Sequence, residues 1–385
     1  MTTPHFVKDF REAAPYIDYL RGKTLVIGIA SSMLESPVLH SLAADIHLLA
    51  SLGVKIVLVH GSRRQISALS EASGITPQYH GGRRITDEAT LTRAKQACGM
   101  IRFDIEAALA VGIAHSPQRG KRLRLACGNF VSARPFGIID GIDMGYTGRV
   151  RKIDVEAIQQ RLNDGAVALI SPLGSSLSGK TFNLSMADIA ESAAIALKAE
   201  KLIFVVEQEG ILDEEGLLIP NLSANEARNL LESDRIQPNQ RRLVQSALTA
   251  VENQIQRVHV LSGLEDGSLM SELFTREGTG TSFSQAPFMS IRQAGSSDIA
   301  DIISLIRPLE EAGILLKRSR EYLENHIREF FVLEHDRQIY GCVALKIFET
   351  EQAAELACLV VSPNAQDGGY GELLLDHVIK ETRAR

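Results

Sequence analysis

The sequence has 385 residues, of which 45% are hydrophobic and 23% are charged, and its formal net charge is −6. This length predicts two or three globular domains, and the acidic balance argues against a nucleic-acid or membrane-surface role. No signal-peptide core occurs, nor any apolar run of the roughly 20 residues that a membrane helix needs. We therefore expect a cytoplasmic protein with small-molecule ligands. The four cysteines lack the pairwise spacing of a metal site and stand at Cys98, Cys127, Cys342 and Cys358.

The first three-quarters of the chain predicts an α/β sandwich. A helix with Phe6, Phe10 and Ala13 on one face is expected first, and it packs either on its own domain or against another subunit. Strands and helices then alternate at the pitch that is typical of a parallel sheet. The predicted strands are 24–30, 54–60, 166–173, 202–206 and 257–261, and the predicted helices include 37–52 and 187–199.

The last hundred residues predict a separate α+β domain. Residues 281–288 belong to a run rich in Thr, Ser and Gly without apolar periodicity, which predicts a linker between domain 1–280 and domain 289–385. A strand and two helices then precede an antiparallel meander. Their predicted ranges are 289–293, 298–309, 322–327, 330–334, 338–348 and 353–361.

Segment 355–372 predicts an anion-binding turn between a strand and a helix. Gln366, Gly368, Gly369 and Gly371 let a backbone pass close to an anion, and the unpaired N–H groups at the helix start face it. A glycine-rich turn without a ligand is the alternative. The spacing Gln-x-Gly-Gly-x-Gly resembles the pyrophosphate loop of the GNAT acetyltransferases.

This resemblance implies a GNAT fold that uses acetyl-CoA as a co-substrate, with no permanently bound cofactor and no metal. It also implies which residues meet acetyl-CoA. These are Leu359, Val360 and Val361 on the strand, and Gln366, Asp367, Gly368, Gly369, Tyr370, Gly371 and Glu372 in the loop and at the helix start.

Amide formation needs a base and donors for the developing oxyanion. The resemblance assigns the base to Glu355, whose apolar neighbours are expected to raise its pKa, although a strand-end glutamate alone would simply be solvated. Cys358 is interpreted as a small wall residue whose backbone contacts substrate, rather than as a nucleophile.

Residues 313–321 resemble the acceptor segment of the N-acetylglutamate synthases. The resemblance implies that Arg318 binds a carboxylate of L-glutamate and that the backbone of Leu316 contributes a contact. A solvated basic turn is the alternative.

The first domain resembles the amino-acid kinase family over about residues 17–280, through segments 57–61, 81–87 and 185–191. Two phosphate-binding features are absent. Residues 28–32 contain no lysine or glycine pair, and residues 62–64 carry two arginines that would crowd a phosphate. Asp188 matches the kinases' aspartate, but one carboxylate alone cannot position a transferring phosphoryl group. We interpret this domain as a regulatory shell without kinase activity.

Arginine-sensitive members of the kinase family hold L-arginine in this domain. The resemblance implies an effector site formed by Tyr16, Lys201, His259, Glu272 and Gly278. A carboxylate such as Glu272 can pair with a guanidinium group. Without the resemblance, Lys201 and Glu272 would be interpreted as solvated charges and His259 as a core histidine.

The two domains in this order resemble the bacterial-type N-acetylglutamate synthases. This implies transfer from acetyl-CoA to L-glutamate, giving N-acetyl-L-glutamate and CoA, the first step of arginine biosynthesis, with feedback inhibition by L-arginine. It also implies a ring-like homo-oligomer, such as a hexamer, joined partly through the first helix. Since the sequence stops at Arg385, where a GNAT domain is expected to continue, we expect a C-terminal truncation. A non-catalytic arginine sensor or fragment, and an acetylglutamate kinase, are the alternatives.

Overall fold

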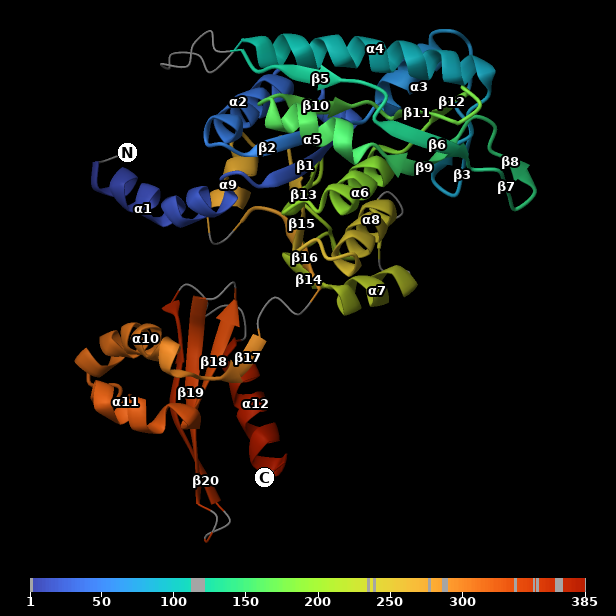
Figure 1. The fold of residues 1–385 in the computed structure, drawn as a ribbon. Coiled ribbons are helices and arrows are strands. Elements are labelled where there is room, and N and C mark those ends of the chain that lie inside the picture. Colours follow the sequence, from blue (N-terminus) through green and yellow to red (C-terminus); the bar gives the residue numbers. More distant parts are fainter. Residues whose placement is uncertain are drawn as a thin grey trace. The chain divides into compact units, whose positions relative to one another are not determined.

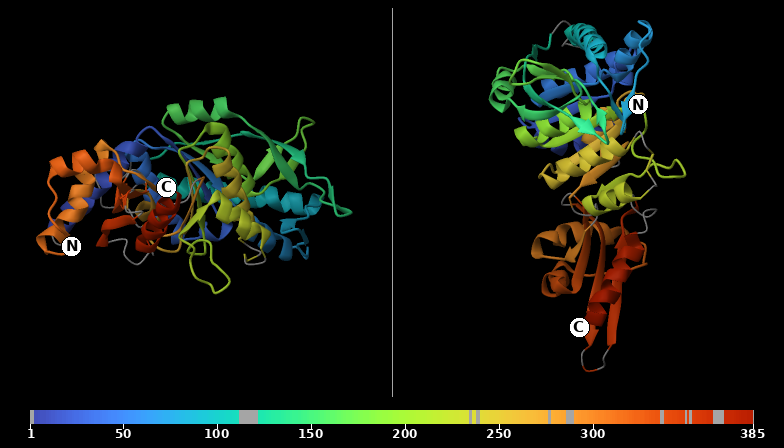
Figure 2. Two further views of the ribbon diagram at one scale, coloured as in Figure 1. Left: turned by 90° about the horizontal axis from the view of Figure 1, so that it is seen from below. Right: turned by 90° about the vertical axis from the view of Figure 1, so that its right-hand side faces the viewer.

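The computed structural model describes residues 3–111, 122–233, 236–237, 240–275, 278–285, 290–335, 338–348, 350, 353–363 and 370–384. The chain divides into two compact units, Met1–Gln285 and Ala286–Arg385 (Figure 1, Figure 2). Each unit has hydrophobic clusters of its own.

The first unit is built on an eight-stranded sheet. Its central strands are parallel, as predicted, because helices return the chain to the same edge between them. Across the sheet the strands are β14 (Asn221–Ser223), β16 (Thr281–Ser284), β15 (Arg257–Ser262), β13 (Lys201–Val206), β1 (Thr24–Ile29), β2 (Lys55–His60), β10 (Val167–Ile170) and β5 (Leu125–Cys127). The strand predicted at 166–173 is shorter in the structure, since β10 ends at Ile170.

Alternate residues of the central strands belong to opposite faces. On β1, Leu25 and Ile27 contact one hydrophobic cluster and Val26 contacts the other. Helices cover both faces and give the three layers of an α/β/α sandwich. One face carries α1 (Thr3–Leu20), α2 (Val38–Ser51), α4 (Glu88–Ala110) and α9 (Ser268–Phe274), and the other carries α5 (Val155–Asn163), α6 (Met186–Leu197), α7 (Ala224–Glu232) and α8 (Arg241–Glu252) (Figure 1).

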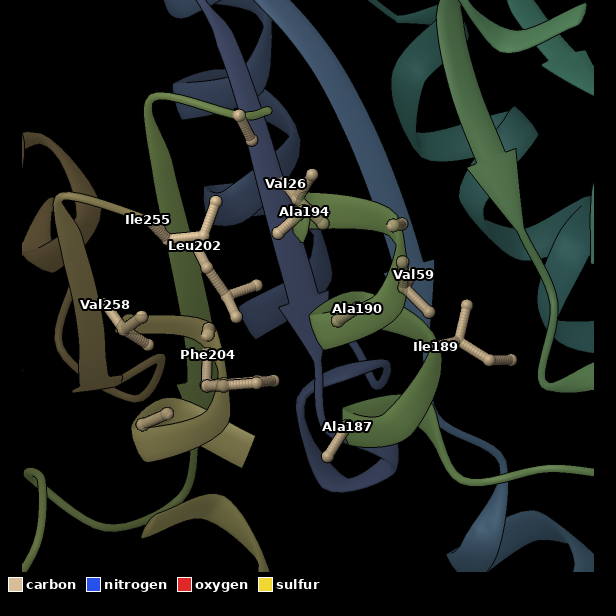
Figure 3. Packing of buried hydrophobic residues seen from close by; sticks show 14 of the residues in the cluster. Val26, Val59, Ala187, Ile189, Ala190, Ala194, Leu202, Phe204, Ile255 and Val258 are labelled. Atoms are coloured by element: carbon tan, nitrogen blue, oxygen red, sulfur yellow. The ribbon is translucent and has the colours of Figure 1, made fainter. Parts of the chain in front are cut away.

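Helix α6 shows how closely these layers pack (Figure 3). Its residues Ala190 and Ala194 are fully buried, and their small side chains let the helix approach the sheet. Gly28 on β1 permits this approach, because a Cβ there would lie 2.6 Å from Met186 Sδ. The sheet contributes large side chains such as Phe204, whose burial stabilises the fold by roughly 1.5–3 kcal/mol.

Several short elements of this unit were not predicted from the sequence. A second sheet has the order β12 (Thr181–Asn183), β11 (Leu173–Ser175), β6 (Val131–Pro135) and β9 (Gly148–Ile153). Helix α3 (Arg63–Glu71) packs against α4. Two small hairpins pair β3 (Tyr79–His80) with β4 (Arg83–Arg84), and β7 (Ile138–Ile139) with β8 (Ile142–Asp143).

The predicted linker 281–288 is wrong for residues 281–284, which form the buried strand β16 antiparallel to β15. The Thr281 hydroxyl donates to Ile219 O at 2.6 Å and accepts from Ile211 N–H at 2.8 Å. Because its hydroxyl is satisfied inside the protein, a polar run can form a core strand. Residues 286–288 lie outside the described residues.

The second unit has the predicted antiparallel meander, and helices cover both faces of its sheet. The strand order is β17 (Ser290–Gln293), β18 (Phe330–His335), β19 (Gln338–Phe348) and β20 (Ala353–Val361). Helices α10 (Ile299–Glu311) and α11 (Arg320–His326) cover one face, and α12 (Tyr370–Ala384) covers the other. Single 3₁₀ turns occur at Ser31–Met33, Ser296–Asp298 and Ile327–Glu329.

Candidate functional site

Strand β20, which carries most of the predicted acetyl-transfer residues, contains a β-bulge. Cys342 pairs with Val360 and Ala344 pairs with Ala357, so β20 has one residue more than β19 between these pairs. Cys358 lies in the bulge with φ +52°, in the left-handed region that side chains disfavour. Because β20 is an edge strand of the described sheet, the bulge presents backbone groups that a ligand can bond.

The three predicted cofactor residues on β20 point in different directions. Val360 is buried in the cluster beneath α10, and Val361 packs on the opposite cluster beside α12. Leu359 is exposed. A ligand that meets all three must therefore do so through their backbone groups.

Cys358 has a buried thiol neighbour that the sequence did not reveal. Cys342 Sγ donates to Cys358 O at 3.8 Å, and both residues are unpaired cysteines. Hydrogen bonding with Cys342, assisted by the charge of Arg318, lowers the pKa of Cys358. The side-chain hydrogen bond between the two thiols, together with burial, raises the pKa of Cys342. Alternating apolar residues placed Cys342 on a strand, but its partner depends on the register of the bulge.

The structure brings the three predicted substrate-binding residues together. Arg318 and Leu316 lie in the loop between α10 and α11, where Leu316 is exposed and Arg318 is half-buried. Arg318 Nη1 donates to Leu316 O at 3.2 Å. Leu315 of this loop packs against the hydrophobic cluster that contains Cys358, so the loop and the bulge are neighbours. A guanidinium group here can pair with a carboxylate.

Glu355 is exposed on β20, opposite Lys346 of β19. Its neighbours Ala354 and Leu356 are exposed as well, so the apolar surroundings that we predicted are absent among the described residues. The prediction is wrong because the first residues of β20 pair with β19 beyond the hydrophobic core, where their side chains are exposed. Glu355 nevertheless lies on the strand that carries the bulge, about 10 Å before Cys358.

Part of the predicted pyrophosphate loop lies outside the described residues, namely Gln366, Asp367, Gly368 and Gly369. The helix predicted after it is confirmed as α12, which begins at Tyr370 and includes Gly371 and Glu372 in its first turn. Leu374 and Val378 are buried against the sheet. The first N–H groups of α12 have no partner within the helix and can bond an anion.

In the first unit, the predicted effector residues Glu272 and His259 are in direct contact. Glu272 is buried on α9, and its Oε1 lies 2.5 Å from His259 Nδ1 of β15. Glu272 Oε2 accepts from the N–H groups of Thr279 and Gly280, at 2.6 and 3.2 Å. Gly278 has φ +62°, and a Cβ there would lie 2.7 Å from Glu272 Oε2. The chain therefore wraps closely around this carboxylate.

This environment sets the protonation of the two groups. Burial raises the pKa of Glu272, but the hydrogen bond and charge of His259, with the two N–H donors, lower it to about 2. Burial and the charge of Lys201 lower the pKa of His259. His259 Nε2 is buried and has no hydrogen-bond partner in the described parts of the chain. The interpretation of Glu272 as a solvated charge is wrong, and one ring nitrogen of His259 is bonded to none of the described protein groups.

Lys201 and Tyr16 are placed less directly at this site. Lys201 begins β13, two residues before Ile203, which pairs with His259. Tyr16 is half-buried on α1 and packs on the cluster that includes Leu269 of α9. The charge of Lys201 thus acts on His259. Tyr16 lies in the same helical layer as α9.

The two segments that lack the kinases' phosphate-binding features, 28–32 and 62–64, are joined by a hydrogen bond. Arg64 N–H, at the start of α3, donates to Ser31 Oγ at 3.1 Å. Asp188, the residue that matches the kinases' aspartate, forms an ion pair with Arg83 at 2.6 Å. Arg83 was not predicted as a functional residue, because nothing in its local sequence indicates this partner. The interpretation of this domain as a shell without phosphoryl transfer stays a prediction.

The described residues contain no group of three or more His, Cys, Asp or Glu side chains that could hold a metal ion. None of the helices within the described ranges is long and apolar enough to cross a membrane.

Comparison with known proteins places both units in families. Residues 23–262 match the amino acid kinase family, and residues 299–385 match the acetyltransferase (GNAT) family. An amino-acid acetyltransferase of Neisseria meningitidis serogroup B is 52% identical over 378 residues, which are 98% of this chain and 86% of the relative. The chain belongs to the amino-acid acetyltransferase family.

Solved structures of this family agree with the fold. The N-acetylglutamate synthase of Neisseria gonorrhoeae complexed with coenzyme A and L-arginine superposes with a TM-score of 0.88 at 50% identity. The comparison covers 98% of this chain and 88% of that one. The same enzyme complexed with coenzyme A and N-acetyl-glutamate gives a TM-score of 0.71 at 51% identity. The predicted combination of an amino-acid kinase fold with a GNAT acetyltransferase domain is confirmed.

Proposed function

We propose that this amino-acid acetyltransferase transfers the acetyl group of acetyl-CoA to the α-amine of L-glutamate. The observation that carries the proposal is the bulge at Cys358 with the Arg318 loop packed against the same cluster, because it combines open backbone donors with a carboxylate-binding cation. The ligands in the gonococcal structures, coenzyme A and N-acetyl-glutamate, are the expected leaving group and product of such a reaction.

In the proposed reaction, Arg318 pairs with a carboxylate of glutamate, and Leu316 O and the Cys358 backbone orient the rest of the molecule. Backbone N–H groups of 359–361 bond the thioester side, and residues 366–372 hold the pyrophosphate. The amine nitrogen attacks the thioester carbon, and the carbon–sulfur bond breaks as CoA leaves and takes a proton. Glu355 removes the amine proton, directly or through a water molecule, which its exposed position permits.

Replacement of the proposed base tests this mechanism. Glu355→Gln should lower kcat for glutamate-dependent CoA release by about 10²–10⁴-fold, because positioned bases contribute factors of that size. The KM for acetyl-CoA should change little. Glu311→Gln, an exposed glutamate on α10, serves as the control. If the wild-type chain releases no CoA in response to glutamate, the alternative of an arginine-sensing protein replaces this proposal.

We also propose that L-arginine binds in the first unit and inhibits the transfer. The buried contact between Glu272 and His259 supports this, because a fixed carboxylate and an imidazole nitrogen without a partner form a polar site for a guanidinium compound. Lys201 can meet the ligand's carboxylate, and carbonyl groups near Gly278 can accept its remaining donors. Inhibition requires that arginine bind two states of the protein with different affinity.

The homo-oligomer expected from the resemblance is a further part of this proposal. Helix α1 exposes Val7 and Phe10, at 38% and 56% of their surface. An amphipathic helix with exposed apolar residues at its outer end is suited to contact a second copy of the chain.

A further inference from the structure

The loop that carries Arg318 is fastened to the end of α10. Ile314 N–H donates to Leu309 O at 2.9 Å, which turns the chain back over the last turn of the helix. Farther along the loop, Arg318 N–H donates to Glu310 Oε1 at 2.9 Å. A carboxylate acceptor makes this bond stronger than one between neutral groups. Glu310 therefore holds the loop at the residue that bears the guanidinium group.

Glu310 and Arg318 lie close to the bulge, because Leu309, next to Glu310, and Leu315 of the loop pack against the cluster that contains Cys358. The charge of Arg318 lowers the pKa of Cys358 and that of Glu310 raises it, after the larger effects of the hydrogen bond with Cys342 and of burial. Both charged groups are half-buried, so solvent only partly screens them. Glu310, Arg318 and the Cys358 bulge thus form one cluster, although they come from a helix, a loop and a strand.

We propose that Glu310 is a positioning residue for the acceptor amino acid, which fixes through the Arg318 backbone the place where the guanidinium group meets a substrate carboxylate. The inference rests on the proposed function, since it takes an amino acid with a side-chain carboxylate as the acceptor. The distance between Arg318 and the bulge determines which length of acceptor places its amine correctly. A shift of about 1 Å in such a group can cost about 10²-fold in rate.

Substitutions of Glu310 and of its neighbour test the proposal. Glu310→Ala removes the acceptor of the Arg318 N–H, and should raise the KM for glutamate about tenfold or more. It should also reduce the preference for glutamate over aspartate, because the loop no longer holds the Arg318 guanidinium group at one distance from the bulge. The KM for acetyl-CoA should stay within about twofold, since the donor site does not involve this loop. Glu310→Gln keeps a side-chain oxygen for the same N–H and should restore most of the glutamate affinity.

Glu311→Ala is the matched control, because Glu311 is exposed in the same helical turn. Thermal unfolding of each variant reports whether the second unit remains folded. The proposal is overturned if Glu310→Ala behaves like Glu311→Ala. It is also overturned if Glu310→Ala raises both KM values together, or if Glu310→Gln fails to rescue the glutamate KM, since the role would then be structural or depend on charge alone. Lack of glutamate acetylation by the wild-type chain would instead overturn the proposed function itself, and the inference with it.

Discussion

Glu272 remains ionised although it is buried, and this has a consequence for stability. Its pKa is lowered from 4.5 to about 2, because the bonds from His259 and the chain at 279–280 outweigh the burial that raises it. A carboxyl whose pKa is lower in the folded state stabilises the protein above its unfolded pKa, and this contribution is lost as the pH falls through the folded pKa.

We therefore expect the free energy of unfolding to fall more steeply for the wild type than for Glu272→Gln between pH 4.5 and about 2. Denaturant titrations at a series of pH values measure the difference. Glu265 is an exposed residue just before α9, and its replacement serves as the control. The difference in the free energy of unfolding between Glu265→Gln and the wild type should be the same at each pH. Parallel pH profiles of the wild type and Glu272→Gln would contradict the assignment.

Residue-level prediction from the sequence had a clear physical limit. The resemblance named Glu272 and His259, but their contact depends on how a helix and a strand 13 residues apart are packed. Glu310 gave no signal at all, because a glutamate in the last turn of an amphipathic helix is ordinarily solvated. Glu355 was expected among apolar neighbours, yet neighbours in sequence do not enclose a side chain beyond the edge of a core.

At the level of elements, the bulge in β20 makes a testable distinction about Cys358. We expect Cys358→Ala to keep most of the wild-type kcat, because its backbone rather than its thiol contacts substrate, whereas loss of a covalent nucleophile would cost about 10⁶-fold. Cys358→Val should be much less active, because a β-branched side chain opposes the φ of +52°. Steady-state kinetics of the two variants, with circular dichroism as a control for folding, measure this. An inactive but folded Cys358→Ala would contradict the backbone role.

The elements themselves were predictable where a run of apolar residues decides the structure. Strands β1, β2, β13 and β15 are such runs, and both faces of each are buried. Strand β16 was not predictable, because its two hydroxyl bonds are made by loops distant in sequence. The bulge was not predictable either, because the extra residue of β20 can be recognised only from its pairing with β19.

At the level of the whole molecule, separate hydrophobic clusters predict separate unfolding transitions for the two units. L-Arginine at about 100 times its Kd should stabilise chiefly the first unit, by about 2.7 kcal/mol, and coenzyme A should stabilise chiefly the second. Differential scanning calorimetry measures both shifts. L-Citrulline, which replaces the guanidinium group with a neutral urea, should have little effect. An arginine-induced shift confined to the second transition would contradict the proposed effector site.

The bulge also sets the distance between the open backbone groups of β20 and Arg318. Strand residues advance about 3.3 Å each, so moving the extra residue by one position would displace the open backbone groups by that distance relative to Arg318. Deleting one residue there would reverse which face every later side chain occupies, and would turn Val360 out of its cluster. Insertions and deletions between 357 and 360 should therefore be far more damaging than substitutions there, and an engineer who wishes to accept longer or shorter amino acids should change the α10–α11 loop instead.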